Sequence, residues 1–243
     1  MNSKAPRYGV ARMISKLGFG SRTQAAKWVR EGRVRVNGRF VKDPEFPINP
    51  GADRITVDGR TDTPVRLVVM LNKPRGLVTT TSDEQGRETV YRCFEGATMP
   101  WLAPVGRLDK ASEGLLLFSN DPAWADRITQ PASGPDKTYH VQIDRLPDAA
   151  LLADLERGIH VDGERLAAKS ARCLRSGHKN AWLEIVLDEG RNRQIRRLLS
   201  AFDIETLRLV RVCLGKLQLG ELPKGKWRVL TEQEIEMLVP AKA

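Results

Sequence analysis

Cysteine and histidine are scarce in this chain of 243 residues, which has three of each. Cys93, Cys173 and Cys213 lie far apart and form no Cys-x-x-Cys pair, so the sequence indicates neither a disulfide framework nor a cysteine metal site. The histidines form no His-Glu-x-x-His pattern either. We therefore interpret all six as ordinary packing or surface residues and expect no metal centre.

Long apolar runs are also absent. The run Leu67–Leu71 has five residues, far fewer than the ~18 that a membrane-spanning helix needs. The first twenty residues carry scattered basic side chains and lack the apolar core of a signal peptide. We therefore expect a cytoplasmic protein without membrane contact, and its length indicates one or two domains.

Acidic residues are nearly missing from the N-terminal part of the chain. Residues 1–42 contain eleven Lys and Arg but one acid, Glu31, so they carry the whole formal net charge of +10. The remaining residues hold equal numbers of basic and acidic side chains. Charge concentrated in this way is typical of a nucleic-acid-binding surface, although a solvated basic face without a partner has the same composition.

Two helices are predicted within this basic segment. The first covers 10–17 and ends at Gly18. The second begins after Ser21, which has capping-box spacing to Gln24, and it stops at Gly32. The residues predicted on its buried stripe are Ala25, Trp28 and Val29, and those on its outward face are Arg22, Lys27 and Arg30.

Short hairpins follow the helices. Asn37-Gly38 and Asp58-Gly59 are strong tight-turn pairs, because both turn positions need positive φ. From Met13 through Arg39 the pattern resembles the small RNA-binding domain shared with ribosomal protein S-four, and we place this domain at residues 7–62. The segments that match are 21–25, 28–29 and 32–38. The resemblance implies contacts to RNA phosphates by basic residues of this module, namely Arg22, Lys27, Arg30, Arg33 and Arg35.

Beyond a linker at 60–66 the pattern changes to strands mixed with helices. The predicted strands are 67–71, 115–118, 139–143, 182–187, 206–212, 216–219 and 227–230. The predicted helices are 123–129, 148–157, 192–201 and 232–239, and a second capping box, Thr231 to Glu234, opens the last one. Many strands with few helices between them favour an α+β domain with a mixed, mainly antiparallel sheet, which we place at residues 66–243.

One acid in this second domain stands out by its neighbours. Asp109 lies between Arg107 and Lys110, shortly before the apolar run Leu115–Phe118. A nearby arginine favours the ionised form of a carboxylate, and an ionised carboxylate can act as a nucleophile. Taken alone, the same stretch is equally consistent with a glycine turn that exposes an ordinary surface aspartate.

Residues 106–109 are similar to the Gly-Arg-Leu-Asp motif of bacterial pseudouridine synthases, in which the aspartate is catalytic. Three further segments resemble, in the same order, motifs of the RsuA-type ribosomal-RNA members of that family. They are Leu71–Thr79, like its Asn-Lys-Pro-x-Gly segment, Lys137–Val141, like its Lys-x-Tyr-x-Val strand, and Glu189–Arg197, like its basic motif. Each motif alone is weak evidence, whereas the ordered set is specific.

The resemblance implies that Asp109 promotes cleavage of the bond between ribose and uracil, after the target uridine has been turned out of the RNA. It implies that Tyr139 stacks on the uracil and that Arg196 pairs with Asp109. No step in this chemistry needs a cofactor. We expect the partner to be ribosomal RNA or a pre-ribosomal particle and the protein to be a monomer. The RNA contacts expected in this domain are Arg107, Lys73, Arg191, Arg193 and Arg197.

Two other functions fit parts of the pattern. A non-catalytic RNA-binding assembly factor would use the basic module for docking and the large domain only as a scaffold. A metal-dependent nuclease would need Asp83, Glu84 and Asp109 as metal ligands, and these carboxylates lack a recurring ligand spacing.

Overall fold

The computed structural model describes residues 8–60, 65–81, 83–130 and 134–238. The chain forms two compact units: the first contains the described residues up to Val68 with 97–103 and 118–125, and the second contains the rest. The predicted domains, 7–62 and 66–243, stay a prediction, because their boundary falls at 61–64, outside the described residues. None of the described helices has the length and apolar character needed to span a bilayer.

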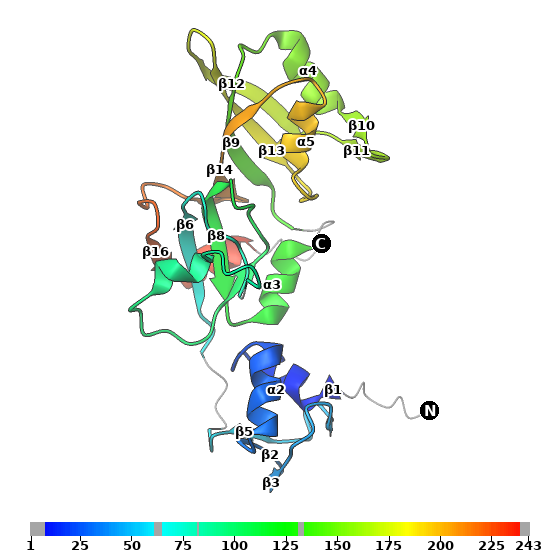
Figure 1. The fold of residues 1–243 in the computed structure, drawn as a ribbon, viewed down its shortest axis with the longest axis vertical. Helices are drawn as coiled ribbons and strands as arrows, with labels where there is room; N and C mark the ends of the chain where they lie inside the picture. Colours follow the sequence, from blue (N-terminus) through cyan, green and yellow to red (C-terminus); the bar gives the residue numbers. More distant parts are fainter. Residues whose placement is uncertain (1–7, 61–64, 82, 131–133, 239–243) are drawn as a thin grey trace. The chain divides into compact units, whose positions relative to one another are not determined.

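The N-terminal module contains the two predicted helices, α1 (Val10–Lys16) and α2 (Arg22–Arg30) (Figure 1). Ser21 caps α2, because its side chain accepts a hydrogen bond from the backbone N–H of Gln24 at 3.1 Å. This confirms the predicted start of the helix. The predicted apolar stripe of α2 also faces the core: Ala25 and Val29 are fully buried, and Trp28 packs partly buried against the same cluster.

Small sheets complete this module. A three-stranded sheet has the order β3-β2-β5, and a separate pair joins β1 to β4. Asn37 and Gly38 have φ of 51° and 80° in the turn between β2 and β3, as predicted for this pair. The strands are β1 (Tyr8–Gly9), β2 (Val34–Val36), β3 (Arg39–Phe40), β4 (Pro47–Ile48) and β5 (Ile55–Val57).

A sheet of nine strands dominates the rest of the chain. Its order is β12-β13-β9-β14-β8-β6-β16, with β15 paired to β14 and β7 paired to β8. The pairs β12–β13, β13–β9, β9–β14 and β6–β16 are antiparallel, whereas β14–β8 is parallel, which confirms the predicted mixed sheet. The strands are β6 (Val68–Lys73), β7 (Ala103–Val105), β8 (Glu113–Ser119), β9 (Lys137–Ile143), β12 (Ser170–Ser176), β13 (Ala181–Leu187), β14 (Thr206–Leu214), β15 (Leu217–Gln218) and β16 (Trp227–Val229).

Four α-helices and one 3-10 helix accompany this sheet in the described residues. Thr231 and Glu234 form the predicted capping box of the last helix, since each side chain accepts a hydrogen bond from the other residue's backbone N–H. The predicted last residue of that helix, 239, lies outside the described residues. The helices are η1 (Val90–Phe94), α3 (Pro122–Thr129), α4 (Ala149–Arg157), α5 (Gln194–Ser200) and α6 (Glu232–Leu238).

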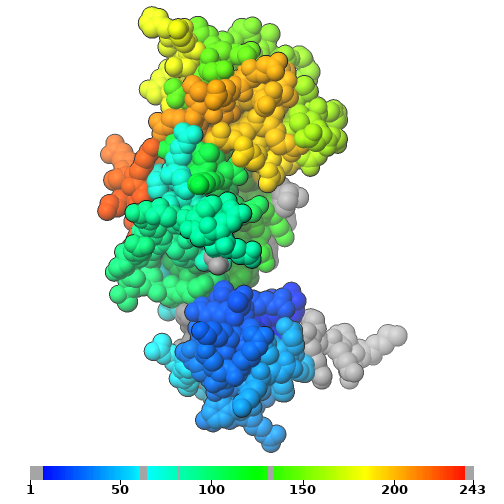
Figure 2. Space-filling model, in the orientation of Figure 1, coloured from blue at the N-terminus to red at the C-terminus, as the bar shows by residue number. Residues whose placement is uncertain are grey.

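The sequence did not predict strand β12 or the hairpin of β10 (Ile159–Val161) and β11 (Glu164–Leu166). Strand β12 lies at the edge of the sheet, and nearly all of its side chains are exposed. An exposed edge strand needs no apolar alternation, so its sequence carries no period-2 signal. The turn at 176–180, between β12 and β13, projects from the surface (Figure 2).

The parallel strands β8 and β14 approach each other closely at Gly114. Gly114 pairs with Arg211 and has a φ of +98°. A Cβ atom at this position would lie 2.2 Å from the backbone oxygen of Arg211. Only glycine fits there, because it has no Cβ and tolerates positive φ. This close contact holds the loop before β8, which carries Asp109, next to β14.

Candidate active site

A cleft of about 340 Å³ lies between the loop before β8, strands β9 and β14, and the turn before α5. Tyr139 of β9 and Leu209 of β14 contribute to its lining, and Asp109 is the one acid among the described residues there. Two of the predicted catalytic residues, Asp109 and Tyr139, therefore share one cavity. The cationic residues that line it are Arg107, Lys137, Arg191, Arg193 and Arg211.

The backbone of the Asp109 loop is held by polar groups of β6 and of the segment that follows it. Thr79 donates its hydroxyl to the Leu108 carbonyl at 2.7 Å, and the Gly76 N–H donates to the Lys110 carbonyl at 2.8 Å. The side chain of Lys73 reaches the carbonyls of both Asp109 (3.1 Å) and Ser112 (2.8 Å). Satisfied carbonyls at successive positions fix the loop, which is what a catalytic group needs from its support.

Lys73, which we predicted to contact RNA, lies inside the protein. Its side chain is fully buried, at 0% exposure, and it donates to the carbonyls of Pro74, Asp109 and Ser112. Burial lowers the pKa of Lys73 to about 8, although the negative charge of Asp109 acts in the opposite direction. In this structure Lys73 is an internal clamp on the Asp109 loop, a position that does not favour its predicted RNA contact, which stays a prediction.

Arg196 acts on the same loop from the other side. Its guanidinium donates to the Ala111 carbonyl through Nη2 and to the Thr206 carbonyl through Nη1, both at 3.2 Å. Burial, together with the charge of Arg193, lowers the pKa of Arg196, whereas the charge of Asp109 raises it.

Within the described part of the chain, no ion pair joins Arg196 to Asp109, so the predicted pair is not formed in this structure. The attraction between the two charges remains, but the direct contacts of Arg196 are to backbone carbonyls. The N–H donors of Arg196 are thus taken up by the carbonyls of Ala111 and Thr206 and not by the Asp109 carboxylate. Arg196 is placed to position the loop that carries the carboxylate.

Tyr139 sits on the wall of the cleft with 9% of its surface exposed. It belongs to β9, where alternate residues face the buried side of the sheet. Across the antiparallel pair with β14 its partner is Arg211, which lines the same cleft. A mostly buried ring with one face toward a polar cleft can serve as a stacking surface for a planar base.

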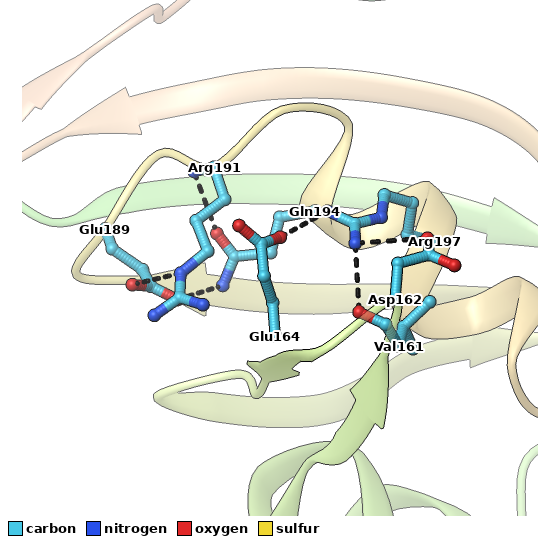
Figure 3. A network of polar contacts seen from close by, with 7 residues as sticks. All are labelled: Val161, Asp162, Glu164, Glu189, Arg191, Gln194 and Arg197. Atoms are coloured by element: carbon cyan, nitrogen blue, oxygen red, sulfur yellow. Dashed lines mark hydrogen bonds and ion pairs between the residues drawn. The ribbon is translucent and has the colours of Figure 1, made fainter.

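The basic motif before α5 divides into two groups, one of which is used for internal contacts (Figure 3). Arg197 donates to Glu164 at 2.7 Å, to Asp162 at 3.3 Å and to the Val161 carbonyl at 3.1 Å. All three partners lie in or between the strands β10 and β11. Arg197 therefore ties this hairpin to α5, and its predicted RNA contact stays a prediction.

Arg191 remains at the cleft, with its Nε paired to Glu189 at 2.8 Å (Figure 3). Gln194 organises this turn: its amide donates to Glu189 at 2.8 Å and to the Ala167 carbonyl at 3.1 Å. Its side-chain oxygen accepts from the backbone N–H of Arg191. Sequence reasoning gave Gln194 no role, since a glutamine beside four arginines carries no signal of its own.

Arg193 and Arg107 fit the predicted role of RNA contacts most directly. Both are exposed, both line the cleft, and among the described residues neither guanidinium has a hydrogen-bond partner. Arg193 is also in the left-handed conformation, with φ of 49° and ψ of 31°, as the cap of α5. A non-glycine residue held in this region is strained, and such strain occurs preferentially at functional sites.

In the N-terminal module, four of the five predicted RNA contacts have side chains at the surface that are free or only weakly paired. Arg33 differs, because it makes a two-pronged pair with Asp58 and a further ion pair with Glu31. These hydrogen bonds raise the pKa of Arg33. Arg33 therefore holds the helix end to the β5 turn. The four exposed residues are Arg22, Lys27, Arg30 and Arg35.

The carboxylates required by the nuclease alternative are not gathered. Asp83 is engaged by Arg87, whose side chain donates to it at 2.6 Å, and by the Arg87 backbone N–H. Within the described ranges, no three His, Cys, Asp or Glu side chains are grouped as ligands for one metal ion.

Two protein families match the chain. Residues 67–201 match the RNA pseudouridylate synthase family, and residues 10–54 match the S4 domain. The first match includes the Asp109 loop, Tyr139 and the basic motif before α5. The second covers both helices of the N-terminal module.

Individual relatives cover nearly the whole chain. An uncharacterized RNA pseudouridine synthase of Aquifex aeolicus is 35% identical over 234 residues, which cover 96% of this chain and 94% of the relative. The ribosomal large subunit pseudouridine synthase B of Bacillus subtilis is 34% identical over 230 residues, with 93% of each protein covered. A crystal structure of a pseudouridylate synthase has a TM-score of 0.66 at 32% sequence identity and covers 96% of this chain and 100% of its own.

Proposed function

The chain belongs to the RNA pseudouridine synthase family and carries an S4 domain, and from this premise we propose that it converts a specific uridine of large-subunit ribosomal RNA to pseudouridine. The relative from Bacillus subtilis bears the name of a large-subunit enzyme and supports the choice of that RNA. The substrate is the free RNA or a particle that contains it.

The composition of the cleft is the observation that supports this function best. One carboxylate, Asp109, faces a cavity whose other charged lining residues are five cations. Cations suit the phosphates of an RNA strand, and they are numerous enough to attract it before any specific contact forms. Because these cations already attract the RNA, we assign the single acid among them to the reaction itself.

In the proposed mechanism the target uridine leaves the RNA stack and enters the cleft, at a cost of a few kcal/mol that phosphate contacts by Arg107 and Arg193 offset. Tyr139 stacks on the uracil. Asp109 then acts as the nucleophile: a carboxylate oxygen bonds to C1′ of the ribose as the bond between C1′ and uracil N1 breaks, and the uracil leaves with the electron pair of that bond.

The uracil then turns within the cleft, and its C5 bonds to C1′ of the ribose as the bond between C1′ and the Asp109 oxygen breaks, which restores the free carboxylate. The proton on C5 is lost, and N1 gains a proton, so no atom is added or removed overall. The fixed backbone at 108–112 keeps the Asp109 carboxylate in place while the base moves. Because the reaction is an internal rearrangement, none of these steps draws on a cofactor.

Deletion of the gene tests the proposed function. We expect carbodiimide-treated large-subunit RNA from the deletion strain to lack one reverse-transcription stop that the parent strain has, and the stop to return when the wild-type gene is supplied. An unchanged pattern of stops, with RNA binding intact, would instead favour the non-catalytic assembly factor.

The exposed cations of α2 are expected to set the salt dependence of RNA binding. Replacing Lys27 and Arg30 together with glutamine removes two phosphate contacts, and each contact contributes about 0.7 to the slope of log affinity against log salt for single-stranded RNA. We therefore expect the slope to fall by about 1.4. Fluorescence anisotropy at salt concentrations from about 50 to about 300 mM measures it.

Arg145→Gln is the matched control for this pair, because it removes an exposed arginine from outside the N-terminal module that is bonded to a backbone carbonyl. Its salt slope should equal that of the wild type. If the double variant also kept the wild-type slope, the S4 module would not be the docking surface.

A further inference from the structure

Arg211 is a buried arginine in β14 for which the proposed mechanism has no use. It is 5% exposed, and it lines the cleft beside Tyr139. Its Nε donates to the Leu115 carbonyl at 2.7 Å, whereas its Nη2 is buried and has no hydrogen-bond partner in the described structure. No carboxylate of the described residues pairs with it.

A guanidinium cannot lose its proton in a protein, so burial leaves Arg211 charged and partly unsatisfied. Native structures rarely keep a buried donor without a partner, and exceptions often mark a site that a ligand completes. The backbone that carries this side chain is fixed, because it is paired on both sides, to Tyr139 of β9 and to Gly114 of β8, and it packs closely against Gly114.

Lys137 is a second partly buried cation beside Arg211. It lines the cleft, donates to the Asp188 carbonyl at 3.3 Å, and has its pKa lowered by burial and by the charge of Arg211. Two cations are thus held close together: Asp136, Asp188 and Glu189 lie near enough to raise the pKa of Lys137, but no ion pair among the described residues joins an acid to either cation. A ligand atom rich in electrons would relieve both the repulsion and the missing hydrogen bond.

The position of Arg211 indicates which part of the RNA supplies that atom. The exposed cations Arg107 and Arg193 can meet phosphates at the surface, where the RNA backbone runs. Arg211, nearly buried and paired across the strands with Tyr139, faces whatever enters the cleft and lies against the ring. In the proposed function this is the uracil base, whose hydrogen-bond acceptors are its two carbonyl oxygens.

We propose that Arg211 donates a hydrogen bond to O4 of the target uracil and thereby selects uridine against cytidine. Arginine has only donors, and cytidine has an amino group in place of O4, so two sets of donors would face each other in the cleft. A site built to hydrogen-bond one group rejects an analogue that lacks it, because the buried partner is left unpaired. This inference rests on the proposed function of the cleft.

Equilibrium binding in an inactive background tests the contact without interference from turnover. In Asp109→Asn protein, RNA whose target uridine is replaced by the pyrimidin-2-one nucleoside, which lacks O4, should bind about 10- to 100-fold more weakly than uridine RNA. Adding Arg211→Met should weaken binding of uridine RNA by a similar factor and abolish the difference between the two RNAs, as expected for two changes to one contact.

Arg175→Met is the matched control, because it removes an arginine of β12 that stacks over Trp182 outside the cleft. It should retain the full preference for uridine RNA. A third RNA, with a neutral methylphosphonate on the 5′ side of the target, separates the base from the phosphate. If Arg211→Met abolished sensitivity to that change rather than to loss of O4, Arg211 would bind phosphate and the proposal would be wrong.

The measurement remains decisive if Arg211→Met does not fold. Equal affinity of Asp109→Asn protein for the two RNAs would by itself overturn the role of Arg211. That outcome differs from failure of the proposed function, which would appear as an unchanged pattern of carbodiimide-dependent stops in the deletion strain.

Discussion

Asp109→Asn is expected to abolish pseudouridine formation while leaving folding and RNA binding close to normal. The carboxylate has no hydrogen-bond partner among the described residues, and the loop is held through its backbone carbonyls, so the amide should be accommodated without disturbance. Loss of a nucleophile lowers turnover on the order of 10⁴-fold or more. Asparagine keeps the shape of the side chain but supplies no negative charge.

Tritium release from RNA labelled at C5 of uridine measures this directly, because the C5 proton leaves only when the isomerisation proceeds. Asp126→Asn provides the matched control: it makes the same chemical change on the exposed surface of α3 and should keep wild-type activity. Turnover by the Asp109 variant within about tenfold of wild type would contradict the proposed nucleophile, since removal of a catalytic nucleophile lowers the rate far more than that.

Arg196 is expected to have the next largest effect, through the position of the loop. Its two Nη atoms bridge the carbonyls of Ala111 and Thr206, a geometry that a lysine ammonium cannot reproduce. Because a displacement of about 1 Å at a catalytic group costs roughly 100-fold in rate, we expect kcat of Arg196→Lys to fall about 100-fold. KM should change little, since the RNA contacts that we propose are made by other residues.

This variant separates two roles that a charge-removing substitution would confuse. Lysine preserves the positive charge near Asp109 but loses the fork to the two carbonyls. Single-turnover kinetics gives the chemical rate, and Arg197→Lys on the same helix is the control, because that residue bonds the β10–β11 hairpin and not the loop. Wild-type kcat in Arg196→Lys would show that charge alone, and not the bridge, is what the reaction needs.

Local chemistry explains which parts of the fold could be predicted from the sequence. The caps at Ser21 and Thr231 depend on residues three positions apart, and the Asn37-Gly38 turn depends on two adjacent residues. Buried strands such as β6 and β8 each contain an uninterrupted apolar run, 68–71 and 115–118, and are recognisable for that reason. Strand β12 could not be predicted, because its side chains are exposed and its sequence lacks the alternation of apolar and polar residues.

The charged residues show the limit of the same reasoning. Lys73, Arg33 and Arg197 resembled RNA contacts because a sequence records the charge of a side chain but not its surroundings. In the structure the first is buried against carbonyls and the other two are paired with acids. Arg211 drew no attention for the opposite reason, since an arginine within an apolar strand predicts only a side chain at the sheet surface.

By itself the sequence determined that the chain has a basic module, an α+β domain and a candidate nucleophile at Asp109, because these follow from composition, short periods and ordered motifs. The tertiary structure alone decided which cations face the cleft and which hold the protein together. Hydrogen bonds to carbonyls and acids 25 or more residues away cause that difference: Arg33 to Asp58 spans 25 positions, Lys73 to Ser112 spans 39 and Arg196 to Ala111 spans 85. Only folding brings such partners within reach of each other.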